Sequence, residues 1–227
     1  MSILLSIDCA FPEAVIAVQR DAVTTWRSFG PQRSHALRLI DELHELFSAA
    51  QVEGSSITRI GVGQGPGSFT GLRVALATAT GLAQAYRAEL VGFSTFEALP
   101  LVDEPTLFAF DARQGMVYAG VRSQQDWIHE PAAISVKDAL ALKSDAVCIL
   151  GTAAQRYSEL SEGLQTTALS HHADPSRCLE LTRRAHAEQI VLPTYKEGAQ
   201  AQRLFGSPEL GRALDADELN ATSNLKG

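Results

Sequence analysis

A glycine-rich segment between an apolar run and a helical pattern carries the clearest chemical signal in this sequence. Residues 63–73 read Gly-Gln-Gly-Pro-Gly-Ser-Phe-Thr-Gly-Leu-Arg. Glycine-rich turns at the start of a helix can bind phosphate through their free N–H groups. The residues of this candidate loop are Gly63, Gly65, Pro66, Gly67, Ser68, Gly71 and Arg73.

The same segment lacks the features of an ATP-binding P-loop. No Gly-Lys-Ser/Thr follows the glycines, so no lysine would reach the terminal phosphates of a nucleotide. Pro66 also removes one backbone donor. We therefore favour a structural turn that forms part of a partner surface, with phosphate binding as the alternative.

The histidines and cysteines form no pattern of metal ligands or catalytic groups. His35 and His44 do not share a helix face cleanly, and His171 and His172 are adjacent in a polar segment that is typical of a solvated loop. No Gly-x-Ser-x-Gly is present, and Ser68 has no evident histidine partner, so a protease triad is not supported. The three cysteines are far apart and are expected to be reduced core thiols.

Composition favours a folded protein of the cytoplasm. The 227 residues are 45% hydrophobic, and the net charge is −7. An acidic chain binds nucleic acid poorly by itself, so another subunit would hold any RNA. The first eight residues lack the basic region of a signal peptide, and no apolar run is long enough to span a membrane.

The elements that must position the glycine-rich segment follow from the apolar pattern. Ser34 is the expected N-cap of the first helix, and three strands precede that helix. This order excludes the usual Rossmann arrangement and is the pattern of an actin/Hsp70/sugar-kinase (ASKHA) half-domain of the α/β class. The predicted strands are 2–8, 14–19, 22–29, 57–62 and 90–93, and the predicted helices are 36–50 and 72–86.

The second half of the chain echoes the first, because it again reads strand, aspartate, turn, strand. Its predicted strands are 106–110, 116–122 and 146–150, with a polar turn after the second, and its predicted helices are 136–142 and 178–187. We therefore expect two related subdomains, each with a mixed sheet of the five-stranded type flanked by helices. The expected division is 1–100, which carries the partner helices, and 101–227, with a mobile polar tail from about residue 210.

Three motifs resemble those of the bacterial TsaB (YeaZ) family of tRNA threonylcarbamoyladenosine synthesis. Residues 63–73 match that family's GxGPGSFTGxR segment, and residues 111–118 (Asp-Ala-Arg-Gln-Gly-Met-Val-Tyr) resemble its DARxGxVY segment. Residues 193–195 (Pro-Thr-Tyr) stand where the family has a late Pro-x-Tyr. The resemblance covers roughly residues 2–196, and its first motif is long and specific.

This resemblance implies a non-catalytic paralogue of TsaD, the enzyme that transfers a threonylcarbamoyl group to the adenosine next to the anticodon. TsaD binds a metal through a His-x-x-x-His pair. In this sequence Thr95 and Leu99 occupy those two places, and neither can replace an imidazole at a transition metal. The resemblance therefore implies no metal and no cofactor of the chain's own, with ATP or ADP at a shared interface in the complex.

The resemblance implies two protein partners, a TsaD-like catalytic paralogue and a TsaE-like small ATPase, and contact with tRNA only through the complex. It implies no membrane contact, and the chain is expected to form a homodimer when it is alone. The docking elements would be helices 36–50 and 72–86. Helix 36–50 has an apolar stripe wider than one core face needs, and helix 72–86 is rich in small residues, although tight packing inside the domain would also explain the small residues. The expected interface residues are Leu39, Leu43, Leu46, Leu72, Leu76, Ala79, Thr80 and Ala83.

Two aspartates at strand ends are the remaining candidates. In nucleotide-binding members of the superfamily, such aspartates hold magnesium or position water near the γ-phosphate. Phe11 and Pro12 are unsuited to a phosphate, so Asp8 is favoured as a turn carboxylate. Asp111 and Arg113 are expected to form a local ion pair or a partner contact, with nucleotide contact as the lesser alternative.

Two other classes of function compete with the non-catalytic subunit. An ATP-dependent small-molecule kinase would use Asp8 and Asp111, and tight magnesium-dependent ATP binding by the isolated chain would support it. A metalloprotease-like hydrolase would need bound metal, and the missing histidine pair makes it the least favoured.

Overall fold

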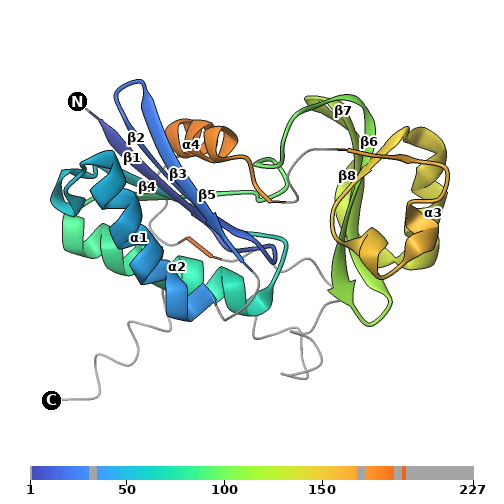
Figure 1. Ribbon diagram of the computed structural model, residues 1–227, viewed down its shortest axis with the longest axis horizontal. Coiled ribbons are helices and arrows are strands. Elements are labelled where there is room, and N and C mark those ends of the chain that lie inside the picture. The colour runs from blue at the N-terminus through green and yellow to red at the C-terminus, as the bar shows by residue number, and fades with distance from the viewer. Residues whose placement is uncertain (1, 31–34, 168–171, 187–190, 193–227) are drawn as a thin grey trace, which may run out of the picture.

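The computed structural model places the chain in two α/β lobes that lie side by side, each built on one five-stranded mixed sheet (Figure 1). It describes the chain outside residues 1, 31–34, 168–171, 187–190 and 193–227, and does not describe the side chain of Arg113. Four expectations fall outside the described residues: the N-cap Ser34, His171, the motif at 193–195 and the tail from about residue 210.

The first sheet has the strand order β3-β2-β1-β4-β5. β1, β2 and β3 form an antiparallel meander, β4 runs parallel to β1, and β5 runs parallel to β4. This arrangement confirms the predicted meander followed by αβαβ. The strands are β1 (Ile3–Asp8), β2 (Ala14–Arg20), β3 (Val23–Phe29), β4 (Arg59–Gly63) and β5 (Glu89–Phe93).

Helices cover both faces of the first sheet. α1 (His35–Ala50) and α2 (Phe69–Tyr86) lie on one face, and α4 (Pro175–Arg184) lies on the other (Figure 1). The alternation of side chains along β1 explains this, because Leu5 packs in the core with α1 and α2 whereas Leu4 packs against α4. Among the described residues, no helix is both long and apolar enough to cross a lipid bilayer.

The second sheet repeats the strand order and the strand directions of the first. Its order is β10-β9-β6-β7-β8, with an antiparallel β6–β7–β8 meander and parallel β9 and β10. The expectation of two related halves is therefore confirmed. The elements are β6 (Val102–Arg113), β7 (Met116–Gln124), β8 (Asp126–Ser135), β9 (Cys148–Leu150), β10 (Gln165–Thr166) and the helix α3 (Val136–Leu142). Three-residue 3₁₀ turns occur at Gly54–Ser56, Lys143–Asp145, Ala153–Gln155 and Ser158–Leu160.

Two expectations for the second half differ from the structure. The polar turn expected after residue 122 is present at Gln125, but the edge strand β8 that follows it was not predicted, because its mixed composition and Pro131 hide its strand character. α4 was expected in the C-terminal subdomain, but it packs on β1, β2 and β4 of the first sheet. The chain therefore crosses between the lobes twice, and the division at residue 100 does not hold for α4.

Candidate functional site

The glycine-rich segment folds back onto the end of β1. The N–H of Ser68 donates to the carbonyl of Ala10 at 2.7 Å, and the Ser68 hydroxyl accepts from the N–H of Gly71 at 3.2 Å as the N-cap of α2. A side chain at Gly71 would collide with the carbonyl oxygen of Cys9. The segment is therefore the close-packed turn that joins β4 to α2, and the chain's own backbone occupies its concave side.

Asp8 is buried beneath this turn, with 2% of its surface exposed. Its Oδ1 accepts from the N–H of Ala10 at 2.8 Å, and its Oδ2 accepts from the hydroxyl of Thr95 at 2.7 Å. That hydroxyl in turn accepts from the N–H of Gly65 at 3.2 Å. A side chain at Gly63 would collide with the Asp8 carboxylate. Asp8 thus joins the end of β1, the glycine-rich turn and the segment after β5.

Burial sets the acidity of Asp8. It raises the pKa of this carboxyl from 3.8 to about 6, although the hydrogen bonds from Ala10 and Thr95 lower the pKa. Both carboxylate oxygens are used inside the protein and almost none of their surface is accessible. This geometry corresponds to the turn carboxylate that the sequence favoured for Asp8, and it leaves no room for a magnesium-bound phosphate.

Asp111 and Arg113 lie at the end of β6 in the second lobe. The Nη1 atom of Arg156 donates to Oδ2 of Asp111 at 3.2 Å. Arg156 directly follows the 3₁₀ turn Ala153–Gln155, so a cation from later in the chain holds this carboxylate. The side chain of Arg113 is outside the described part, so the pair expected between Asp111 and Arg113 stays a prediction.

Aromatic side chains fill the space between the two strand ends. Phe11, three residues after Asp8, stacks on Phe110 with ring centroids 3.9 Å apart. Phe96 packs edge-on against both rings, at 5.9 Å and 5.8 Å. All three rings are at most 2% exposed and belong to one buried cluster that joins the lobes. A ligand between Asp8 and Asp111 would have to displace this stack.

Most residues expected at a partner interface lie instead in the core of the chain. Leu39, for example, is 1% exposed, and of the eight residues only Thr80 is exposed. The other seven are covered by the chain itself, and their contact with a partner stays a prediction. The reason is that α1 is apolar on two sides, and the sheet covers the side that carries Leu39. The buried residues are Leu39, Leu43, Leu46, Leu72, Leu76, Ala79 and Ala83.

The outer face of these two helices is apolar as well. Leu37 is 70% exposed and Ile40 is 59% exposed, one helical turn apart on α1. The neighbouring helix α2 exposes Ala77, Thr80 and Gly81, which have little bulk. Such a face is costly to leave in water, and it can receive another helix closely. We call these five residues the outer helix face.

Thr95 and Leu99 stand at the two places that the resemblance assigns to the histidine pair of TsaD-like enzymes. Both are fully buried, and the Thr95 hydroxyl is occupied by Asp8 and Gly65. Within the described residues, no group of three or more His, Cys, Asp or Glu side chains is placed to hold a metal ion.

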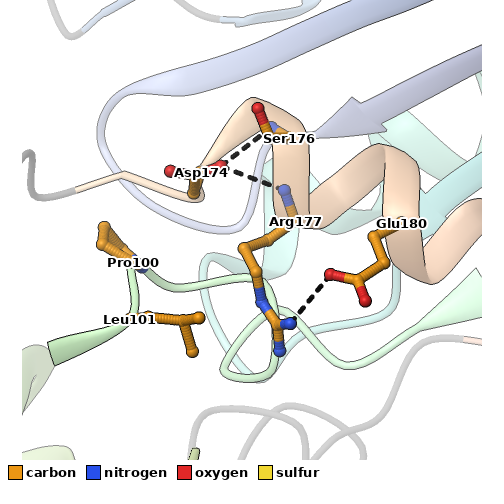
Figure 2. Close-up of a pocket in the computed structure, with 6 residues that line it drawn as sticks. All are labelled: Pro100, Leu101, Asp174, Ser176, Arg177 and Glu180. Atoms are coloured by element: carbon orange, nitrogen blue, oxygen red, sulfur yellow. Dashed lines mark hydrogen bonds and ion pairs between the residues drawn. The ribbon is translucent and has the colours of Figure 1, made fainter. Parts of the chain in front are cut away.

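A cavity of about 350 Å³ lies beside the N-terminus of α4. Figure 2 shows the Asp174 carboxylate turned towards the N–H groups of Ser176 and Arg177, to which it binds at 2.8 Å and 3.0 Å. Arg177 pairs with Glu180 at 2.9 Å. The N-terminus is therefore already capped by an anion of the chain. Sequence reasoning missed this region, because Pro100 and Leu101 are far in sequence from Asp174, Arg177 and the rest of the lining.

Comparisons with known proteins agree on one group. The family model described as TsaD, tRNA N6-adenosine threonylcarbamoyltransferase, matches residues 29–191. The TsaB protein of tRNA threonylcarbamoyladenosine biosynthesis from Bacillus subtilis is 25% identical over 75% of this chain and 83% of its own length. The TsaB of Escherichia coli is 28% identical over 51% of this chain, which spans about half (52%) of that relative. The solved structure of YeaZ from Pseudomonas aeruginosa matches this chain with a TM-score of 0.69 at 22% identity, over 86% of this chain and all of YeaZ. This chain therefore shares the ASKHA fold.

Proposed function

Because the chain belongs to the TsaD family of tRNA N6-adenosine threonylcarbamoyltransferase proteins, and within it to the TsaB (YeaZ) group, we propose that it acts in the synthesis of threonylcarbamoyladenosine in tRNA. Its role is that of a non-catalytic subunit. It binds a TsaD-like enzyme and holds that enzyme in an active arrangement.

The non-catalytic role is supported by what occupies the two regions where chemistry would occur. At the places assigned to the metal-binding histidines, Thr95 is buried and donates to Asp8, and Leu99 is a buried apolar side chain. Phe11 and Phe110 stack between the ends of β1 and β6. An active kinase or transferase would need open space and free polar groups at these positions.

The outer helix face is the observation that carries the proposed docking. Leu37 and Ile40 are two of the most exposed large apolar side chains of the described structure, and they lie on one helix. Exposed apolar side chains that gather on one face mark protein interfaces, whereas scattered ones do not. The exposed small residues of the neighbouring helix α2 would let a partner helix approach. The same face would pair two copies of the chain when the enzyme is absent.

Nucleotide and tRNA would be ligands of the complex. With Asp8 enclosed and the aromatic stack in place, ATP or ADP would bind at the interface shared with the enzyme. A TsaE-like small ATPase would act on this assembly. The net charge of −7 supports tRNA binding by the partner subunits.

Docking is tested with the double variant Leu37→Glu/Ile40→Glu, mixed with the TsaD-like protein of the same organism. Two charges in the centre of an apolar interface are strongly unfavourable, so size-exclusion chromatography with light scattering should show loss of the mixed complex. Val147→Glu is the matched control, because Val147 is 44% exposed but lies in the second lobe.

Circular dichroism should show that both variants remain folded, since the altered side chains are exposed. A mixed complex that survives the double substitution would refute the docking face. Tight magnesium-dependent binding of ATP to the wild-type chain alone would instead support the kinase alternative.

A further inference from the structure

The segment that leads from the first lobe to the second is held by hydrogen bonds at five consecutive carbonyl groups. This connector runs from the end of β5 to the start of β6, over residues 94–101. Its carbonyl oxygens at residues 96, 97, 98, 99 and 100 all accept hydrogen bonds from groups outside the connector. A loop that acts as a hinge must change its backbone torsions, and each of these bonds opposes such a change.

Three of the five bonds come from one arginine of the second lobe. Arg122 on β7 donates through Nη1 to Phe96 at 3.4 Å and through Nη2 to Leu99 at 3.0 Å and to Pro100. Only 1% of Arg122 is exposed. A planar guanidinium with several fixed donors is suited to binding adjacent carbonyl groups at once.

The second lobe fixes the position of Arg122 in turn. Its guanidinium lies 4.7 Å from the ring centroid of Phe108 and 5.0 Å from that of Trp127. The Trp127 Nε1–H donates to the carboxylate of Glu97 in the connector at 2.7 Å. Burial lowers the pKa of Arg122 to about 10, so the side chain stays charged at neutral pH.

The other two bonds come from the chain that returns to the first lobe. The N–H of Asp174 donates to the carbonyl of Ala98 at 2.7 Å, and Nη2 of Arg177 on α4 donates to the carbonyl of Glu97 at 3.3 Å. The outward and the return crossing are thus bonded to each other. Figure 2 shows Arg177 extending from α4 past Pro100 and Leu101.

We propose that Arg122 and Arg177 lock the connector from its two sides, so that the two lobes form one rigid body and do not open and close about a hinge. The Phe11–Phe110 stack adds a direct contact between the lobes beside the connector. The inference concerns the chain alone and does not rest on the proposed function. It predicts that the second lobe keeps a fixed orientation relative to any partner bound to the outer helix face.

The test measures the distance between the lobes by double electron–electron resonance in the full-length protein. Nitroxide labels are attached at Ala49→Cys on α1 and Lys137→Cys on α3, both exposed, in a Cys148→Ser background. Cys9 and Cys178 are at most 1% exposed and should not react. The wild-type lobes should give a single narrow distance distribution, and a broad or two-peaked distribution would overturn the proposal.

Three variants show whether the arginines cause the rigidity. Arg122→Met keeps an unbranched side chain between the rings but releases three carbonyl groups, so the distribution should broaden or gain a second distance. Arg177→Met removes one of the two bonds from the α4 side and leaves the bond from Asp174 to Ala98, so the distribution should broaden less than in Arg122→Met. Because Arg177 is nearer the surface, this variant should fold even if Arg122→Met does not.

Arg59→Met is the matched control. Arg59 also donates to two carbonyl groups, those of Thr182 and Arg183, but all of these contacts lie inside the first lobe. Its distribution should match the wild type. Distributions that stay narrow in folded Arg177→Met and in any folded Arg122→Met would refute the lock.

Discussion

Replacing Asp8 by asparagine should remove a large part of the pH dependence of folding. The carboxyl ionises with a pKa of about 6 in the folded protein, compared with 3.8 when it is not perturbed. Each pKa unit corresponds to about 1.4 kcal/mol, so this difference corresponds to about 3 kcal/mol. The cause is burial, which disfavours the charged form more than the hydrogen bonds from Ala10 and Thr95 favour it.

The sign of the effect follows from which state holds the proton more tightly. The folded chain binds this proton more tightly than the unfolded chain does. The free energy of unfolding is therefore highest below about pH 3.8 and falls as the pH rises towards 6, after which the contribution of Asp8 is constant. An asparagine side chain cannot ionise, so the Asp8→Asn variant lacks this fall.

The assay is urea denaturation at a series of pH values, compared between the wild type and Asp8→Asn. The difference in unfolding free energy should shift in favour of the variant by about 2–3 kcal/mol from about pH 4 to about pH 7. Thr95→Val should have the opposite effect to Asp8→Asn, because losing the Thr95 hydrogen bond raises the pKa of Asp8 further and extends the fall to higher pH. Ser48→Ala, an exposed and neutral change on α1, should give a difference that does not vary with pH.

A pH-independent difference between Asp8→Asn and the wild type would refute this reasoning. It would mean that Asp8 ionises at the same pH in the folded and unfolded chains, and hence that the site under the glycine-rich turn is accessible to water.

Three further changes test the packing of the first lobe and the junction, each by guanidinium denaturation followed by circular dichroism. Leu43→Ala should destabilise the fold by about 2–5 kcal/mol, because Leu43 is 3% exposed, and a loss below about 1 kcal/mol would contradict its place in the core. Phe11→Ala should cost about 3–5 kcal/mol through loss of the stack between the lobes, and a near-neutral result would show that the stack is not formed. Gly71→Ala should destabilise the fold, because its Cβ meets a backbone carbonyl. Gly81→Ala should stabilise the fold by up to about 1 kcal/mol, because nothing lies within 4 Å of its Cβ. A Gly71→Ala variant more stable than Gly81→Ala would exclude the described turn.

The order of elements in the first lobe could be predicted because each element has a strong local signal. The strands are short apolar runs, and the glycine-rich segment marks the strand-to-helix junction. The N-cap Ser68 was not recognised, so α2 begins three residues before the predicted start at residue 72. The edge strand β8 was missed because an edge strand faces solvent along much of its length, and Pro131 is tolerated only there.

The faces of the partner helices could not be predicted from the pattern alone. α1 carries Leu39, Leu43 and Leu46 on one side and Leu37 and Ile40 on another, and the sequence does not show which side meets the sheet. Only the packing of α1 on β2 and β3 decides this. Docking through α1 and α2 therefore stays a prediction, and most of the residues expected at the interface lie on the inner side of these helices.

The lock on the connector had only a faint signal in the sequence. Arg122 ends a run of apolar residues on β7, where a charged residue is unexpected in a buried strand. Its acceptors are backbone carbonyl groups, which leave no trace in the residue types of the connector. Arg177 and Asp174 are more than seventy residues away in sequence, so their contact with the connector emerges only from the fold.

The return of α4 to the first lobe sets an order for folding during synthesis on the ribosome. The second lobe is one continuous stretch inserted between β5 and α4, so all of its strands emerge together. The first sheet emerges earlier, but its face with Leu4 and Ala17 stays uncovered until Leu179 leaves the exit tunnel. The lobe that is translated first is therefore completed last, and until then its uncovered face is available to chaperones.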